Sequence, residues 1–590
     1  MAQWVWGAAA LAGLSTASIT TLTKAQTTLQ VVYPPDGYQT EAEQIFFIGT
    51  GAADQPVLLN GEPIEGRSAS GHFAPSRPLS LGANTFTLIQ GDQTLSITVT
   101  RVPAGPALPA TLGFAEGSLV PAVDVARQPG DWVCLGAIAP TNATVTASLA
   151  GQTYTLLPQS DRADLPPNSA VLTDQAQPIA AAGPSRYESC FMAEAPGNLG
   201  QPTYSLTQGG STVTTAAPGA ISILNPSAIE VVEVTAAAGV ARTGPSTDYS
   251  RLTPLPQGTR ARVTAREGDW LRLDYGGWIR AAETQPVAGG AVVRSLIRGV
   301  TSRQVPGWTE IYFPLQVPVP VSVEQGTDTF TLTLHNTVPQ TDTIYVTDDG
   351  LVERLDWNPI LPDQVEYLIH FKTDQQWGYK LRYEGTTLVL SLKQPPSIQA
   401  SRPLAGTTIL VDPGHGGDEP GSRGPNGTPE KDVNLAVSLL LQAALEARGA
   451  TVIMTRTADS TVAVNDRPAQ IAQVEPTLAL SIHYNALPDS GDAQNTAGIG
   501  AFWFHTQAHS LAQFLHDYLV TELDRPSYGV FWNNLALTRP HVAPSVLLEL
   551  GFMINPNEFE WATDPQEQAK LAETLAEGVE LWVQQTGAGE

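Results

Sequence analysis

The chain has 590 residues, which is too long for one hydrophobic core, so we expect several domains. Apolar residues make up 42% of it, which excludes wholesale disorder, and its net charge of −26 disfavours nucleic acid and anionic lipid as partners. Glycine (52) and proline (47) are plentiful, and helix-period runs are scarce before about residue 430, which favours β-rich modules over most of the chain.

The N-terminus has the features of a secretory signal. The first 22 residues carry no charged side chain, and the segment from Val5 to Leu14 is apolar and small. We therefore expect residues 1–25 to be a signal peptide, with a short membrane anchor or a disordered end as the alternatives. No later run approaches the ~18 apolar residues of a membrane span. The mature chain is thus expected to be exported, to lie in the periplasm or cell envelope, and to have no transmembrane span.

Two β-sandwiches are predicted next. Strand-like runs and the hairpin sequence Asn60-Gly61 define the first at residues 30–103, and its pattern resembles immunoglobulin-like modules of bacterial surface enzymes. A proline-rich linker separates it from a second predicted sandwich at residues 113–225.

The only two cysteines, Cys134 and Cys190, fall in the second predicted sandwich. In an exported protein such an isolated pair predicts one disulfide, and two buried free thiols are the alternative. Trp132 lies two residues before Cys134, so strand geometry predicts both side chains on one face.

The sequence of residues 230–286 predicts a small β-barrel. The order of Arg242, Gly244-Pro245-Ser246, Gly268-Asp269-Trp270 and Gly277-Trp278 resembles the bacterial Src-homology-3-like module. Modules of that family often bind cell-wall peptides, so the resemblance implies a binding role. Packing of Trp270 and Trp278 within the barrel is the alternative.

The last part of the chain changes character. Alternating strands predict a further β domain at residues 292–395, whereas residues 406–586 alternate strands with helices. That alternation implies an α/β domain with a largely parallel sheet. Within it, Thr428 and Pro429 fit the N-cap and first position of a helix that ends before Gly449. The expected architecture is multidomain, with N-terminal all-β modules followed by this α/β domain.

Four residues of the α/β domain predict a metal-dependent hydrolase. His415 and His483 lie at the ends of apolar strands, where functional groups of α/β sheets gather. Glu430 lies in the first turn of a helix, where an acid also suits the helix dipole, which is the structural alternative. Glu549 interrupts an apolar strand, where a carboxylate is costly unless it is paired or used. Two histidines and one glutamate can hold a catalytic zinc, and a second carboxylate can act as general base.

These residues lie in four ordered motifs, D-P-G-H-G-G, G-x-x-G-x-x-E-K-D-V-N-L, S-I-H-x-N and L-x-E-L-G-F-x-x-N. Their order over residues 406–586 resembles the zinc-dependent N-acetylmuramoyl-L-alanine amidases (the Amidase_3 family). The resemblance implies cleavage of the amide bond between N-acetylmuramic acid and L-alanine in peptidoglycan, in cell-wall remodelling or cell separation. It assigns His415, Glu430 and His483 as zinc ligands and Glu549 as the catalytic glutamate. Residues 292–395 are then similar, in position and pattern, to the AMIN domains that help to localise some cell-wall amidases.

Further residues are candidates by their position. We expect Asp412 to shape the turn or to support a ligand, and Asn485, Arg539 and Asn555 to contact substrate. The remaining histidines of this domain do not form an H-E-x-x-H pattern, so we expect surface or packing positions for them. These are His505, His509, His516 and His541.

Some family members insert a long regulatory helix after S-I-H-x-N. Here residues 486–498 are too short and too rich in helix breakers for such a helix. We therefore expect control to rest on the N-terminal modules, which are also the expected contact for envelope regulators.

Two other functions are weighed against the amidase. One is a non-catalytic wall-binding scaffold, which usually lacks a ligand or the glutamate, whereas all four residues are present here. The other is a zinc peptidase that cuts within the stem peptide, which the identity of the new amine terminus would reveal.

Overall fold

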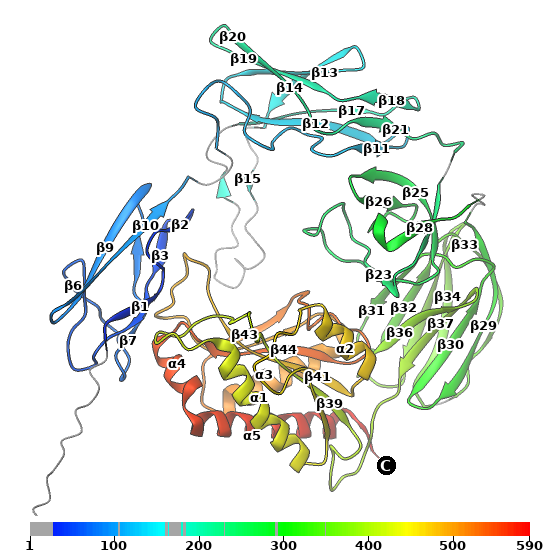
Figure 1. Ribbon diagram of the computed structural model, residues 1–590. Coiled ribbons are helices and arrows are strands. Elements are labelled where there is room, and N and C mark those ends of the chain that lie inside the picture. The colour runs from blue at the N-terminus through cyan, green and yellow to red at the C-terminus, as the bar shows by residue number, and fades with distance from the viewer. Residues whose placement is uncertain are drawn as a thin grey trace, which may run out of the picture.

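The computed structural model describes residues 28–589 except 104–106, 160–162, 165–178, 181–184, 229, 289–292 and 349. The expected signal peptide at residues 1–25 lies outside the described residues. The described chain forms four β-rich units and one α/β domain, arranged so that the first unit (blue) returns to the last domain (yellow to red) in Figure 1. No helix among the described residues is long and apolar enough to span a membrane.

The first unit, residues 28–103, packs two sheets around a core that includes Phe47, Phe73 and Leu88. The sheet orders are β1-β4-β7 and β2-β10-β9-β5-β6, and β3 pairs separately with β8. Asn60 and Gly61 both have positive φ and form the tight turn between β5 and β6, as their sequence predicts. The strands are β1 (Gln30–Tyr33), β2 (Tyr38–Thr40), β3 (Gln44–Phe46), β4 (Ile48–Thr50), β5 (Leu58–Leu59), β6 (Glu62–Pro63), β7 (His72–Phe73), β8 (Ser76–Pro78), β9 (Gly82–Gln90) and β10 (Gln93–Arg101).

The second unit shares a sheet with the third. Strand β11 pairs with β21 of its own unit and with β25 of the next, which makes one sheet across the boundary. The ion pair between Arg272 and Asp131, at 2.5 Å, adds to this junction. The strands of the second unit are β11 (Val125–Arg127), β12 (Trp132–Ala139), β13 (Thr144–Leu149), β14 (Gln152–Pro158), β15 (Ala163–Asp164), β16 (Ile179–Ala180), β17 (Ser185–Met192), β18 (Gly197–Gly200), β19 (Thr203–Gln208), β20 (Ser211–Ala216) and β21 (Ile221–Ile223).

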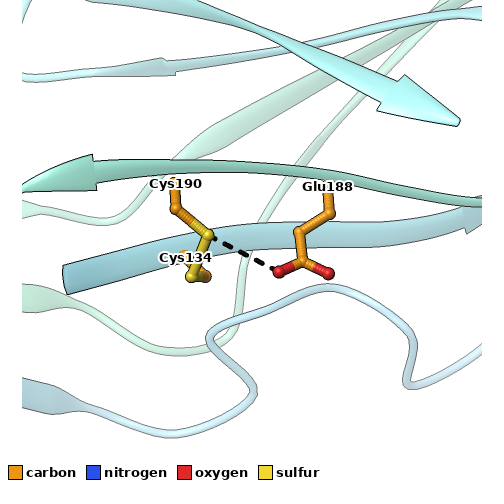
Figure 2. A group of neighbouring side chains, drawn as sticks. All are labelled: Cys134, Glu188 and Cys190. Carbon is orange, nitrogen blue, oxygen red and sulfur yellow. Dashed lines mark hydrogen bonds between the residues drawn. A yellow bond between two sulfur atoms is a disulfide. The ribbon is translucent and has the colours of Figure 1, made fainter. Parts of the chain in front are cut away.

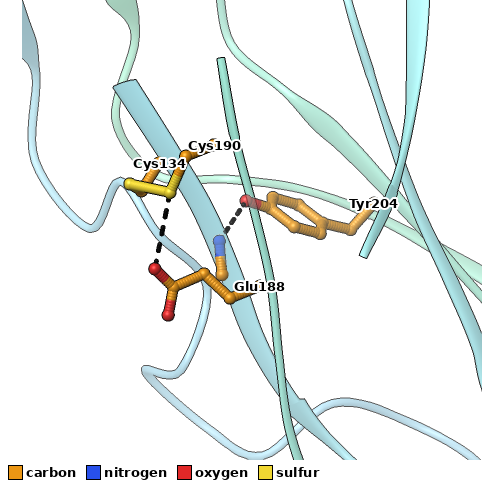
Figure 3. Close-up of a disulfide and its surroundings, with 5 residues drawn as sticks. Cys134, Glu188, Cys190 and Tyr204 are labelled. Carbon is orange, nitrogen blue, oxygen red and sulfur yellow. Dashed lines mark hydrogen bonds between the residues drawn. A yellow bond between two sulfur atoms is a disulfide. The ribbon is translucent and has the colours of Figure 1, made fainter. Parts of the chain in front are cut away.

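Cys134 and Cys190 form a disulfide between β12 and β17 (Figure 2). Trp132 and Cys134 are both exposed, so they share the outer face of β12, and Trp132 lies opposite the exposed Met192 of β17. On the inner side, the Tyr204 hydroxyl accepts a hydrogen bond of 3.1 Å from the Gly136 amide (Figure 3).

The third unit is a small barrel-like fold in which Trp270 and Trp278 are buried, at 9% and 8% exposure. The packing alternative therefore describes both side chains better than an open binding surface. Arg280 lies over the Trp270 ring and Arg127 over the Trp278 ring. The elements are β22 (Val231–Val234), β23 (Ala238–Gly239), β24 (Leu255–Pro256), β25 (Arg260–Glu267), β26 (Trp270–Leu273), β27 (Trp278–Arg280), the 3-10 helix η2 (Ala281–Glu283) and β28 (Thr284–Pro286).

The fourth unit has two sheets, ordered β33-β29-β30-β37-β36 and β31-β32-β35-β34, over a core that includes Phe313, Phe330 and Tyr367. The four N-terminal units are therefore mostly β, as the composition predicts. The strands are β29 (Ser295–Val305), β30 (Trp308–Pro314), β31 (Val321–Gln325), β32 (Thr329–Leu334), β33 (Thr337–Tyr345), β34 (Val352–Leu361), β35 (Gln364–Phe371), β36 (Tyr379–Glu384), β37 (Thr387–Lys393) and β38 (Ser397–Ile398).

The C-terminal domain is built on one six-stranded sheet with the order β40-β39-β41-β44-β42-β43. Strands β40, β39, β41 and β44 are parallel, and β42 runs antiparallel to β44. The elements are β39 (Thr408–Pro413), α1 (Glu430–Ala447), β40 (Thr451–Met454), α2 (Asp466–Val474), β41 (Leu478–Asn485), β42 (Ile499–Trp503), α3 (Thr506–Glu522), β43 (Ser527–Trp532), β44 (Ser545–Phe552), α4 (Pro556–Thr563), α5 (Pro565–Thr586) and β45 (Ala588–Gly589).

Both faces of this sheet are covered. Helices α1, α3 and α5 pack on one face around apolar side chains such as Val411, Ile482 and Leu548. The other face packs against Ile471 of α2 and against Trp308 of β30 in the fourth unit. The fourth unit therefore contributes to the core of the α/β domain.

The sequence prediction of this domain was incomplete. Helix α1 begins at Glu430, and neither Thr428 nor Pro429 caps it through a side-chain hydrogen bond, so the predicted N-cap was wrong. Strand β43 and helix α4 were not predicted.

Candidate metal centre

His415 lies on a tight loop after β39, and a hydrogen bond to its backbone carbonyl helps to hold it in place. Its φ is +58°, and its carbonyl accepts a hydrogen bond of 2.7 Å from Arg467 Nη2. A Cβ on the preceding Gly414 would lie 2.3 Å from His483 Cε1, so only glycine allows the two histidines to approach. The imidazole rings have their centroids 4.9 Å apart.

Glu430 joins the two histidines. Its Oε1 lies 3.1 Å from His483 Nδ1 and 3.3 Å from His415 Nε2. Its Oε2 accepts hydrogen bonds from the Ser422 amide and hydroxyl, and Asn434 donates to Oε1. Burial alone would raise the pKa of Glu430, but the contacts with the two histidines hold it well below its usual range.

The geometry of these three residues suits one metal ion. Their donor atoms all lie within 4.8 Å of one another. Ligands about 2.1 Å from a shared tetrahedral ion are separated by about 3.4 Å, close to the 3.1 and 3.3 Å found here. Their chemistry, two imidazoles and a carboxylate, is that of a catalytic zinc site with one open position.

Glu549 lies beside this cluster. It is opposite His483 in the register of β44 and β41, and opposite Gly500 of β42 on its other side. Its Oε2 is buried and has no hydrogen-bond partner among the described residues. Burial first, and then the charge of Glu430, raise the pKa of Glu549 well above its usual range.

Asp412 supports the loop of His415 from beneath. Its buried carboxylate accepts hydrogen bonds from Thr455, Arg467 and Ser481 at 2.6, 2.6 and 2.7 Å. Arg467 also donates hydrogen bonds to the carbonyls of Pro413 and His415, so it links Asp412 to the His415 loop. Sequence reasoning missed Arg467, because a buried arginine is uncommon and an isolated one leaves no motif.

The three residues predicted to contact substrate make hydrogen bonds within the protein. Asn485 ends β41 and accepts a hydrogen bond from the amide of Ala486. Asn555 caps α4, and its Nδ2 donates to the carbonyls of Gln494 and Thr496, so its interactions are structural. Arg539 lies before the start of β44 and bonds to Asn534. His483 lies near the other end of the neighbouring strand β41, so the structure does not bring Arg539 to the cluster.

The remaining histidines serve packing or lie on the surface. His505 and His541 lie near Tyr379 of the fourth unit, and burial lowers their pKa to about 3 and about 4. His509 is exposed beside Trp503, and His516 contacts Ser527.

A second group of potential ligands lies in the second unit, where Glu188 Oε1 is 3.5 Å from Cys190 Sγ. Both sulfurs of this group belong to the disulfide, so they are not thiolate ligands.

An α/β domain with a His–Glu–His cluster, beside a glutamate whose Oε2 has no hydrogen bond from the described part of the chain, has the composition of a metal-dependent hydrolase site. Residues 409–581 match the N-acetylmuramoyl-L-alanine amidase family. A relative from Staphylococcus epidermidis, "Probable cell wall amidase LytH", is 32% identical over 220 residues, which is 37% of this chain and 70% of that protein. "Uncharacterized protein YqiI" of Bacillus subtilis is 31% identical over 196 residues, 33% of this chain and 94% of that protein. The chain belongs to the N-acetylmuramoyl-L-alanine amidase family and is a peptidoglycan hydrolase.

Solved structures of amidases are similar to a part of the chain. An amidase from Clostridium difficile 630 is 27% identical, with a TM-score of 0.30, and the match covers 31% of this chain and 100% of that one. AmiC2 of Nostoc punctiforme is 27% identical, with a TM-score of 0.29, and the match covers 30% and 99%.

Proposed function

We propose that the chain is a zinc-dependent amidase that cleaves the bond between the lactyl group of N-acetylmuramic acid and the L-alanine of the stem peptide. The observation that carries the proposal is the unpaired, buried Oε2 of Glu549 beside His483, next to the His415–Glu430–His483 cluster. Such an oxygen is costly to bury unless a reaction uses it.

His415, Glu430 and His483 would hold the ion. When bound, zinc lowers the pKa of water and polarises a carbonyl oxygen. Glu430 is restrained by Ser422 and Asn434, so its carboxylate needs little reorganisation to act as a ligand.

Glu549 is the proposed proton carrier. As a carboxylate it accepts a proton from the attacking water while the new bond to the lactyl carbonyl carbon forms. It then donates that proton to the nitrogen of L-alanine as the amide bond breaks. The products are a carboxylate on the glycan strand and a free amine on the stem peptide.

Two rival functions differ from this proposal in testable ways. A non-catalytic wall-binding scaffold would release no fragments. A zinc peptidase would expose an amine within the stem peptide instead of that of L-alanine.

We further propose that the β units, including the Src-homology-3-like and AMIN-like segments, retain the exported enzyme at peptidoglycan or at envelope regulators. Because Trp270 and Trp278 are buried, the exposed pair of Trp132 and Met192 is the better candidate surface.

The test is digestion of purified peptidoglycan with the full chain, followed by mass spectrometry and labelling of new amines. The expected products carry a new amine on L-alanine. A chelator should abolish their release by the enzyme. Intact glycan–peptide linkages, or new amines only inside the stem peptide, would contradict the proposal.

A further inference from the structure

The loop of residues 486–498 crosses the strand that carries Glu549. It connects β41 to β42, and these strands lie on either side of β44 in the sheet. It starts directly after Asn485 of the His483 strand and ends just before Gly500, which lies opposite Glu549. The loop therefore lies beside the strand ends that carry His483 and Glu549.

The loop contains no helix or strand of its own. Long segments without regular structure depend on contacts from outside to adopt one conformation. One set of such contacts comes from the C-terminal domain, where Asn555 bonds to Gln494 and Thr496, and Glu558 Oε2 accepts from the Gly498 amide at 3.1 Å.

The other set comes from the first β unit, more than 400 residues earlier in the chain, and Asp489 is its centre. The carboxylate of Asp489 accepts hydrogen bonds from Thr40 at 2.6 Å, from Tyr38 at 3.2 Å and from Tyr33. Gln44 Nε2 donates to the neighbouring carbonyl of Ser490 at 2.5 Å. Hydrogen bonds to a charged acceptor are stronger than neutral ones.

Gln494 is a second anchor, five residues after Asp489 in the loop. Its Oε1 accepts from the Ala74 amide at 3.1 Å, and its Nε2 donates to the Gly66 carbonyl at 2.6 Å. Ser76 also donates to the Gly491 carbonyl, at 3.3 Å. The loop is thus bonded to the first unit along its middle, from Asp489 to Gln494.

An apolar cluster closes the junction. Phe46 and Ile48 of the first unit pack with Ala493 of the loop and with Phe552 and Ile554, which follow Glu549 on the chain. All five side chains are buried. The first unit also reaches α4 (Figure 1), where the Ser70 amide donates to Glu560 at 2.7 Å.

We infer that the first β unit, residues 28–103, is a built-in clamp of the active site, and that Asp489 is a positioning residue that holds the substrate-side loop 486–498. The part of this inference that concerns catalysis rests on the proposed amidase function. The clamp fixes the loop beside the site through Thr40, Tyr38 and Tyr33 and leaves the metal ligands on elements of the C-terminal domain.

The test compares full-length Asp489→Ala and Asp489→Asn with the wild type. The control is Glu43→Gln, an exposed carboxylate of the first unit that pairs with Arg101 and not with a residue of the loop. Measurements are hydrogen exchange of residues 486–498, zinc content, melting temperature, and kcat and KM on a soluble muropeptide.

We expect Asp489→Ala to raise exchange in the loop at least tenfold and to lower kcat/KM about tenfold, mainly through KM. Asp489→Asn should give a smaller effect, since its carbonyl still accepts hydrogen bonds, and zinc content should stay constant. Thr40→Val removes a hydrogen-bond partner of Asp489, so it should also raise loop exchange and lower kcat/KM. In the double variant with Asp489→Ala, these effects should be smaller than the sum of the two single effects.

Unchanged loop exchange in Asp489→Ala overturns the clamp. Increased exchange with unchanged or higher kcat/KM overturns the positioning role. If the wild type cleaves no peptidoglycan, the proposed function fails, and loop exchange alone then decides the clamp.

Discussion

Glu549 lies opposite His483 across two neighbouring parallel strands, and its Oε2 is buried without a partner among the described residues. This relationship places the carboxyl group of Glu549 beside the histidine that, with His415 and Glu430, can hold a metal ion. The Asp412–Arg467 pair and Gly414 keep the two histidines close together.

His415→Ala and His483→Ala should each lower bound zinc to a small fraction of one equivalent, because two remaining ligands cannot complete the site. Metal analysis of purified full-length protein checks this. His509→Ala, an exposed histidine of the same domain, serves as the control and should keep its zinc. Full zinc retention in both ligand variants would refute the assignment.

Trp132→Ala should weaken sedimentation with insoluble peptidoglycan roughly tenfold, the usual effect of removing a central exposed aromatic from an interface. Leu81→Ala is the matched control, since Leu81 is 64% exposed and Trp132 62% exposed. Equal sedimentation of the two variants would exclude the Trp132–Met192 surface as a wall contact.

The junction of the fourth unit with the α/β domain should weaken in acid. Burial lowers the pKa of His541 to about 4, so the unfolded chain binds this proton at higher pH than the folded chain does. The contribution of neutral His541 to the free energy of unfolding is complete above about pH 6.5. It is lost as the pH falls towards 4, by up to about 3 kcal/mol.

Melting temperatures of wild type and His541→Gln between pH 4 and 8 measure this contribution. The variant should show a shallower loss of stability in acid than the wild type. Parallel curves for wild type and His541→Gln would show that His541 makes no such contribution.

Removing the disulfide should destabilise the second unit. Cys134 and Cys190 are 56 residues apart, and the chain-entropy relation gives such a loop roughly 4 kcal/mol. A double Cys134→Ser and Cys190→Ser variant should therefore unfold at lower denaturant concentration, and thiol titration of unreduced wild type should find no free thiol. Two titrating thiols in unreduced, unfolded protein would contradict the pairing.

The sequence predicted the regular parts of the α/β domain well. Apolar runs that end at His415 and His483 or surround Glu549 predicted β39, β41 and β44, and the start and stop residues Pro429 and Gly449 predicted α1. Helix α4 was missed because Asn555 and Pro556 look like loop residues, although they form its N-cap and first position. Strand β43 was missed because Gly529 interrupts its short pattern.

The candidate site was predictable only through its motifs. Their order brought together the three ligand candidates and Glu549, whereas Arg539 and Asn555 were selected by position alone, and their contacts lie elsewhere. The contact of Asp489 with Thr40 joins residues 449 positions apart, and no local pattern encodes such a pair. The burial of Trp270 likewise depends on packing that the sequence does not reveal.

The most direct test of the account is amide cleavage by Glu549→Gln, measured with zinc content and melting temperature on the same preparation. The substitution is nearly isosteric and leaves the three proposed ligands intact, so fold and zinc should be retained. The rate of release of stem peptide should fall by roughly 10²–10⁴, the usual contribution of a positioned proton-transfer group. A folded, zinc-loaded Glu549→Gln protein that cleaves at near the wild-type rate would contradict the role of Glu549 as the proton carrier.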